Sequence, residues 1–162
     1  MIKNTWLKFG IFLIAVPLFI IFITSALMIS TSVHKALAKD TFATTTSLDK
    51  KADDLYDGGN YTGSLVYYTK ALTINPNDTD ALNGKGYALS NLDNSTGAIH
   101  FFDKALSINS NDTNALDGKG FALDDLGNTT QAIKLYDKSL SIDPKDTDAL
   151  QAKSDDLKPA NQ

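Results

Sequence analysis

Aspartate is the residue type through which this chain could do chemistry. All 19 acidic residues are Asp and all 15 basic residues are Lys, so Glu and Arg are absent. Carboxylates can transfer protons, hold a divalent cation or attract a positively charged partner. The candidate binding residues are mostly such carboxylates, spread between residues 49 and 148: Asp49, Asp53, Asp80, Asn83, Tyr87, Asp117, Phe121, Asp124 and Asp148.

The sequence lacks the residues of most catalytic sites. It has no Cys, which excludes disulfides, thiolate catalysis and Cys-based zinc sites. Its two histidines, His34 and His100, are far apart, and no nucleophile elbow or phosphate loop occurs. We therefore expect neither an enzyme nor a bound cofactor or metal.

Asp-rich stretches such as Asp78-Thr79-Asp80 could be calcium loops or helix caps. A calcium loop needs alternating oxygen ligands, a central Gly and a distal Glu, and this chain has no Glu. Asp followed by Thr just before an apolar helical pattern is typical of an N-cap. The stretches are therefore interpreted as caps.

The charge balance argues against nucleic acid as a partner. From Lys39 onward there are 12 Lys and 19 Asp, a net charge of −7. Binding to a phosphate backbone requires a basic surface.

The N-terminal region, residues 1–30, contains an uncharged apolar run at residues 9–29. A helix of this length reaches about 30 Å, enough to cross the hydrocarbon core of a bilayer. The run predicts a transmembrane signal anchor or a signal peptide. Ala36-Leu37-Ala38 resembles a cleavage site, whereas the length of the run favours a retained anchor.

The flanking charges predict the topology only weakly. Lys3 and Lys8 precede the run and Lys35 and Lys39 follow it, which slightly favours a cytoplasmic N-terminus. We expect a single-pass membrane protein whose larger part lies outside the cytoplasm, or a secreted protein if the chain is cleaved after Ala38. Residues 31–44 are predicted to be a linker.

The rest of the chain repeats itself every 34 residues. The stretch from Ala71 to Leu82 returns from Ala105 to Leu116 and again from Ser139 to Leu150. A fixed period of this length indicates a stacked array of supersecondary units. Apolar residues at three- and four-residue spacing predict two helices in each unit, separated by turns rich in Asn, Asp and Pro.

This pattern resembles the tetratricopeptide repeat family. The resemblance covers residues 45–146 and rests on small residues (Ala52, Gly86, Gly120), alanines in the second helix (Ala98, Ala132) and a following aromatic (Tyr68, Phe102, Tyr136). It departs from the family where Lys51, Lys85 and Lys119 replace a customary leucine. The aromatics are interpreted as core residues.

The resemblance implies an all-α fold, a right-handed superhelical array of antiparallel helix pairs with about three repeats and a capping helix. The expected segments are repeat 1 (divergent) at 45–78, repeat 2 at 79–112, repeat 3 at 113–146, and a capping helix and tail at 147–162.

The resemblance also implies a concave groove lined by the first helix of each unit. The groove-facing residues would be Asp49, Asp53, Asp57, Asp80, Asn83, Tyr87, Asn114, Asp117, Phe121, Asp124, Asp125, Asp148, Gln151 and Asp155. Family members that clamp a peptide's terminal carboxylate use cations in this groove, which are missing here. The partner is then a basic protein or peptide. The alternative is that these carboxylates only solvate the helices.

Five Asn-x-Ser/Thr patterns, at Asn60, Asn77, Asn94, Asn111 and Asn128, mark potential glycosylation sites. Turn and cap preferences of a repeat also generate this pattern without any modification.

The function expected from the sequence is a membrane-anchored or exported scaffold for protein–protein interaction through an acidic concave groove. Two alternatives stay open: a self-associating structural array of the cell envelope, which would be a homo-oligomer, and a docking platform that faces the cytoplasm.

Overall fold

The computed structural model describes residue 35 and residues 37–157. The chain divides into two compact units, Met1–Ala43 and Thr44–Gln162. The predicted membrane segment at residues 9–29 lies outside the described residues. No helix among the residues that are described has the length and apolar character needed to cross a membrane.

The segment predicted as a linker is helical wherever the structure describes it. In the first unit residue 35 and residues 37–43 are helical, and in the second unit the helical residues begin at 44. Leu37, Ala38 and Lys39 are strong helix formers, so local propensity supports this conformation. This segment is therefore helical although its sequence has no apolar periodicity.

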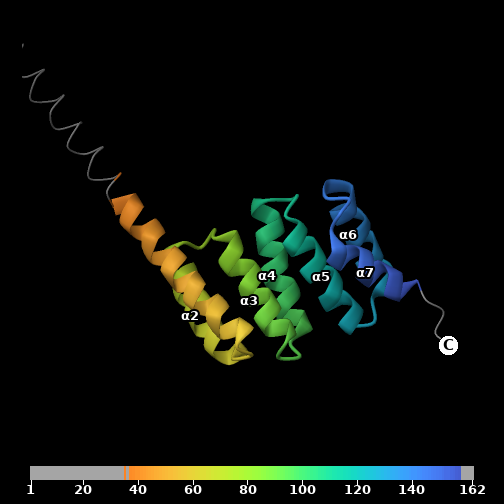
Figure 1. Ribbon diagram of the computed structural model, residues 1–162, viewed down its shortest axis with the longest axis horizontal. Coiled ribbons are helices and arrows are strands. Elements are labelled where there is room, and N and C mark those ends of the chain that lie inside the picture. Colours follow the sequence, from red (N-terminus) through yellow and green to blue (C-terminus); the bar gives the residue numbers. More distant parts are fainter. Residues whose placement is uncertain (1–34, 36, 158–162) are drawn as a thin grey trace, which may run out of the picture. The chain divides into compact units, whose positions relative to one another are not determined.

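The second unit is a stack of helices joined by short turns (Figure 1). It starts with the helical residues 44–57, which we call the leading helix. Six helices follow: α2 (Tyr61–Ile74), α3 (Thr79–Ser90), α4 (Ser95–Ile108), α5 (Thr113–Asp125), α6 (Thr129–Ile142) and α7 (Thr147–Asp156). The described residues contain no strand, and the all-α prediction is confirmed.

Side-chain caps begin most of these helices. Asp78, Asp112 and Asp146 are the N-caps of α3, α5 and α7, and the carboxylate of each accepts a hydrogen bond from a backbone amide in the first turn. Asn60 and Asn94 cap α2 and α4 in the same way. The interpretation of the Asp-Thr stretches as caps is confirmed.

Aromatic side chains lock the helices together. Tyr68, Phe102 and Tyr136 are buried, as predicted. Phe102 of α4 lies between Gly86 of α3 and Gly118 of α5, where an added Cβ would come within 2.7 Å and 2.4 Å of the ring. Only glycine leaves room for the ring at both positions, so Phe102 joins the first helix of its own repeat to that of the next.

The first helices form the inner layer of the stack. Among the described helices, α3 packs against α5 and α5 against α7, whereas the second helices α2, α4 and α6 make no contact with one another. In a curved array the closer layer lies on the inside. The groove predicted from the sequence is therefore on the side of the leading helix, α3, α5 and α7.

Lysines replace a leucine contact between neighbouring repeats. Lys85 donates a hydrogen bond to Thr69 of α2 at 2.8 Å. Lys119 pairs with Asp103 of α4 at 2.6 Å, and Lys153 pairs in the same way with Asp137 of α6. These lysines thus point toward the second helices, away from the inner layer.

Gly118→Ala should destabilise the protein. Alanine favours a helix by about 1 kcal/mol, but overpacking a buried ring costs about 1–3 kcal/mol. Because the added Cβ would lie only 2.4 Å from the ring, the cost should be near the upper end of this range, and we expect a net loss of about 1–2 kcal/mol in chemical denaturation of the full chain. Adding Phe102→Leu should recover part of the loss, because the smaller side chain makes room for the methyl group. A Gly118→Ala variant as stable as the wild type would contradict the tight fit.

Candidate functional site

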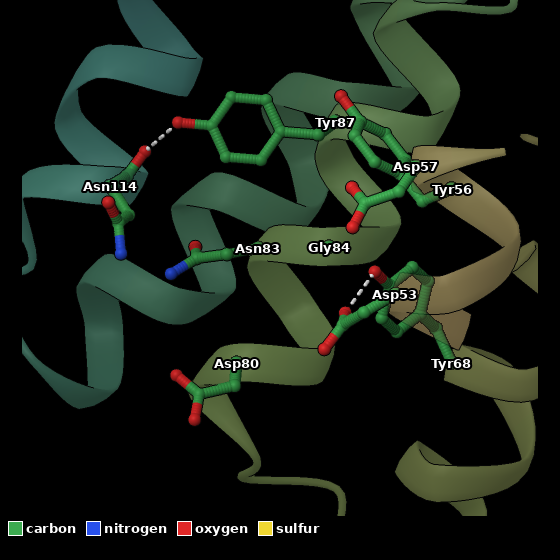
Figure 2. Close-up of a pocket in the computed structure, with 9 residues that line it drawn as sticks. All are labelled: Asp53, Tyr56, Asp57, Tyr68, Asp80, Asn83, Gly84, Tyr87 and Asn114. Carbon is green, nitrogen blue, oxygen red and sulfur yellow. Dashed lines mark hydrogen bonds between the residues drawn. The ribbon is translucent and has the colours of Figure 1, made fainter. Parts of the chain in front are cut away.

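A pocket opens on the inner layer between the leading helix and α3, and its lining also includes Tyr68 of α2 and Asn114 of α5. It has a volume of about 450 Å³. It is lined by Asp53, Tyr56, Asp57, Tyr68, Asp80, Asn83, Gly84, Tyr87 and Asn114. Figure 2 shows three of its carboxyl groups, those of Asp53, Asp57 and Asp80, around Gly84. None of the lining residues carries a positive charge.

Three side chains that line the pocket donate hydrogen bonds within the array. The Tyr68 hydroxyl donates to Oδ1 of Asp53 at 2.7 Å, and the Tyr87 hydroxyl donates to the carbonyl oxygen of Asn114 at 2.8 Å (Figure 2). The Nδ2 group of Asn83 donates to Asp112 at 2.9 Å. The Oδ1 atom of Asn83 is buried and accepts no hydrogen bond. The pocket is therefore rich in acceptors.

Burial and neighbouring charges raise the pKa of two carboxyl groups in this region. Burial, followed by the charges of Asp78, Asp53 and Asp80, raises the pKa of Asp49 to about 6. Burial and the charges of Asp78, Asp112 and Asp53 also raise the pKa of Asp80. Like charges at close range disfavour ionisation, and a cation placed among them would relieve this repulsion.

In repeats 2 and 3, one residue of the first helix faces the N-cap residue of the next repeat's first helix. In repeat 2 this is the Asn83–Asp112 hydrogen bond, in which an amide meets a carboxylate. The equivalent residues in repeat 3 are Asp117 and Asp146, and a hydrogen bond between their carboxyl groups contributes to the pKa shift of each. Two carboxyl groups can share such a bond only if one of them holds a proton.

Asp117 is the carboxyl group of this pair whose pKa is raised. Burial and the hydrogen bond with Asp146 raise the pKa of Asp117 to about 7. Burial alone would raise the pKa of Asp146, but hydrogen bonds from Asp117, the amide of Ala149 and Ser139 lower it. The Ser139 hydroxyl lies 3.1 Å from both carboxyl groups. Asp117 is only 4% exposed, so it lies inside the array.

The structure brings four of the nine predicted binding residues together. Asp53, Asp80, Asn83 and Tyr87 line the pocket, with Asp57 and Asn114 of the wider groove set. Asp49 lies nearby on the leading helix, within the electrostatic influence of Asp53 and Asp80.

The other predicted residues lie farther along the array and do not line the pocket. The carboxylate of Asp124 accepts a hydrogen bond from the Tyr136 hydroxyl at 2.7 Å, and the ring of Phe121 packs against that of Tyr136. Asp148 is exposed in the first turn of α7. Asp117 is buried, as described above. Within the described part of the chain, no group of three or more His or Asp side chains is arranged to hold a metal ion.

Sequence reasoning missed three pocket residues, Tyr56, Tyr68 and Gly84. Tyr68 was interpreted as core, and it is buried, but its hydroxyl end also reaches the pocket. An added Cβ at Gly84 would lie 2.3 Å from the Tyr68 ring, so glycine is needed at this position. Gly84 and Gly118 are 34 residues apart, and each faces the aromatic ring of the preceding repeat. This repeated glycine was the sequence signal for the contact between Gly84 and Tyr68.

The five Asn-x-Ser/Thr patterns differ in what their Asn side chains do. All five residues are exposed at turns. Asn60 and Asn94 cap helices with hydrogen bonds from Gly63 and Gly97. Asn128 is an N-cap residue whose side chain makes no capping bond. Glycosylation of any of these residues stays a prediction.

Comparison with known protein families identifies the repeats. Two family models described as tetratricopeptide repeat match residues 67–100 and 114–146. The second match coincides with the α5–α6 pair, whereas the first begins inside α2. The chain therefore contains tetratricopeptide repeats, as predicted. No curated protein matches the chain.

Solved tetratricopeptide domains share the fold. The Arabidopsis OM64 domain has a TM-score of 0.68 at 19% identity, over 72% of this chain and 97% of that one. The first domain of Spaghetti (RPAP3), bound to the HSP90 peptide SRMEEVD, has 0.67 at 21%, over 69% and 91%. The second domain of human RPAP3, in complex with the HSP70 peptide SGPTIEEVD, has 0.68 at 16%, over 74% and 99%.

Asp117→Asn should stabilise the protein at neutral and alkaline pH. The folded pKa of about 7 exceeds the ordinary value of 3.8, so stability falls as pH rises from about 4 to 7. An Asn amide would donate to Asp146 as Asn83 does to Asp112. At pH 8 we expect about 1–3 kcal/mol of added stability in urea denaturation and a smaller change between pH 5 and 8.

The reverse substitution at the equivalent position is the matched control. Asn83→Asp creates another carboxyl pair with Asp112 and should destabilise the chain at pH 8 more than at pH 5. An Asp117→Asn variant with lower stability than the wild type at pH 8 would show that the pair is not repulsive.

Proposed function

We propose that this protein is a scaffold that binds a basic segment of another protein along the inner layer of its repeats, held at a membrane by residues 9–29. The observation that carries the binding proposal is the pocket beside α3. Asp53, Asp57 and Asp80 line it, and no positively charged residue does.

The distribution of charge supports a basic partner. Lys85, Lys119 and Lys153 hold the second helices through Thr69, Asp103 and Asp137. These three lysines are therefore engaged with the second helices. The pocket on the inner layer is lined by three carboxyl groups and by no positively charged side chain. A concave surface whose charges all have one sign attracts and orients a partner of the opposite charge.

Structurally similar domains bind acidic peptides, whereas the partner proposed here is basic. Spaghetti (RPAP3) and human RPAP3 are solved with peptides that end in the acidic sequence EEVD. An acidic groove would repel such a tail, so the partner proposed for this chain is basic. This choice rests on the pocket's charges, because the fold alone does not fix the ligand.

Charge removal in the pocket tests the proposal. Synthetic peptides of graded lysine content would be titrated against the full chain in a neutral detergent. Asp57→Asn with Asp80→Asn should weaken binding of the lysine-rich peptides roughly 5- to 10-fold, since each exposed ion pair contributes up to about 1 kcal/mol. Peptides rich in aspartate should not bind.

The control removes the same charge elsewhere. Asp54 lies on the leading helix outside the pocket lining, and Asp103 lies on α4 opposite Lys119. The Asp54→Asn/Asp103→Asn variant should bind like the wild type. Equal weakening by both pairs would indicate diffuse attraction only, and no binding of lysine-rich peptides would refute the proposed function.

Protease treatment of intact cells tests the membrane proposal. A tag after Gln162 should be digested from outside, and the retained protein should have the mass of the full chain. These results follow if residues 9–29 span the membrane with the N-terminus inside. Protection of the tag until lysis would show that the repeats face the cytoplasm. A mass that lacks the first 38 residues would show that the chain is cleaved and secreted.

A further inference from the structure

We propose that an exposed face of α7 binds an amphipathic helix of another protein, which packs there as α4 packs on α3 and as α6 packs on α5. The face consists of Leu150, Ser154 and Leu157, and we call it the end face. The inference does not depend on the proposed function, because α7 contributes no residue to the pocket.

The first helices α3 and α5 are each covered by a second helix at the same three positions. These positions are four and three residues apart, and in α3 and α5 they hold Leu82, Gly86, Leu89, Leu116, Gly120 and Leu123. Leu82 is buried in one cluster with Phe102 of α4, and Leu123 in one with Tyr136 of α6. The glycine between the leucines contacts the same aromatic ring. The three positions thus form the surface that receives a second helix.

In α7 the same three positions are exposed. Leu150 is 48% exposed and Leu157, the C-cap residue, is 63% exposed, whereas their counterparts Leu116 and Leu123 in α5 are 1% and 8% exposed. Ser154 is exposed as well. Among the helices from α2 to α7, only α5 and α6 pack against α7. The end face is therefore an acceptor surface for a second helix that the described residues do not supply.

The other end of the array has the polar surface that the end face lacks. In α3, Ala81 and Ala88 are buried against the preceding helix α2. Their counterparts in the leading helix are Ser47 and Asp54, which are polar and exposed. A polar outer face keeps the terminal unit of a solenoid soluble. The C-terminal end keeps two leucines instead, so it resembles an internal repeat that waits for a helix.

Repeat 1 indicates which kind of helix the end face accepts. In the leading helix the three positions hold Leu48, Ala52 and Leu55, so the middle position carries a Cβ, as it does in α7. Ala52 is buried in one cluster with Tyr68 and Ala71 of α2. The expected occupant is therefore a helix with an aromatic residue on its apolar side and a small residue three positions later.

A peptide with the α2 sequence, residues 61–74, is the probe. It would be capped at both ends and titrated into the full chain, with labelled leucine methyl groups, in nanodiscs of a neutral lipid so that no detergent covers the leucines. We expect saturable NMR shifts at Leu150 and Leu157, with a Kd on the order of 0.1–1 mM, because so short a helix must fold as it binds. The same peptide with Tyr68→Ser should bind at least roughly 10-fold more weakly, since it loses its largest apolar group.

Variants of the protein locate the peptide. Leu150→Gln/Leu157→Gln should weaken binding at least roughly 10-fold, while unchanged backbone shifts in α7 show that the helix stays folded. Leu92→Gln/Leu126→Gln is the matched control, because these leucines lie in turns and are 41% and 47% exposed. This control should bind like the wild type. Equal weakening by both pairs would indicate general apolar adhesion and overturn the inference.

Three further results would also overturn the inference. Leu150 and Leu157 signals that change with protein concentration before any peptide is added would assign the end face to a second copy of the chain. Protection of these methyl groups from a soluble paramagnetic agent in the free protein would show that the chain covers the face itself. Shifts confined to Leu48 and Leu55 would show that the peptide only replaces α2 in its own repeat.

Discussion

The insertion of one aromatic ring between two glycine-containing helices is the interaction on which this array depends. Phe102 lies between Gly86 and Gly118, and the rings of Tyr68 and Tyr136 each meet one glycine, Gly84 and Gly120 respectively. The ring of Phe102 therefore ties two consecutive first helices to the second helix between them. A methyl group at these glycines would overlap the ring. The spacing of the inner layer is consequently set by residues without side chains.

This close spacing explains the electrostatics of the inner layer. First helices that approach one another bring their polar residues into one narrow space, where Asp49, Asp80 and Asp117 all have raised pKa values, mainly because of burial. Repeat 2 avoids part of this cost with an amide at Asn83, next to a pocket that collects three carboxylates. Negative charge that is costly to the free protein is available to stabilise a bound cation.

Much of this arrangement could be predicted from sequence. The 34-residue period identified the helix pairs, the Asp caps and the buried Tyr68, Phe102 and Tyr136, because each follows from local pattern. The convergence of Asp53, Asp80, Asn83 and Tyr87 followed from the resemblance. What escaped prediction depends on pairing between repeats: Lys119 bonding to Asp103, Asp117 turning inward against Asp146, and Tyr56 reaching the pocket. Such pairings depend on how each unit is rotated against the next, which a repeat pattern does not encode.

The claim that the first helices form the binding face is tested most directly by paramagnetic relaxation. A lysine-rich peptide carrying a spin label would be added to the isotope-labelled full chain in a neutral detergent, and the broadening of each amide signal would be recorded. The account predicts strong broadening in the leading helix and in α3 around Gly84, with little effect on the outward-facing residues of α4 and α6. Broadening centred on α4 and α6, or equal broadening over both layers, would contradict it.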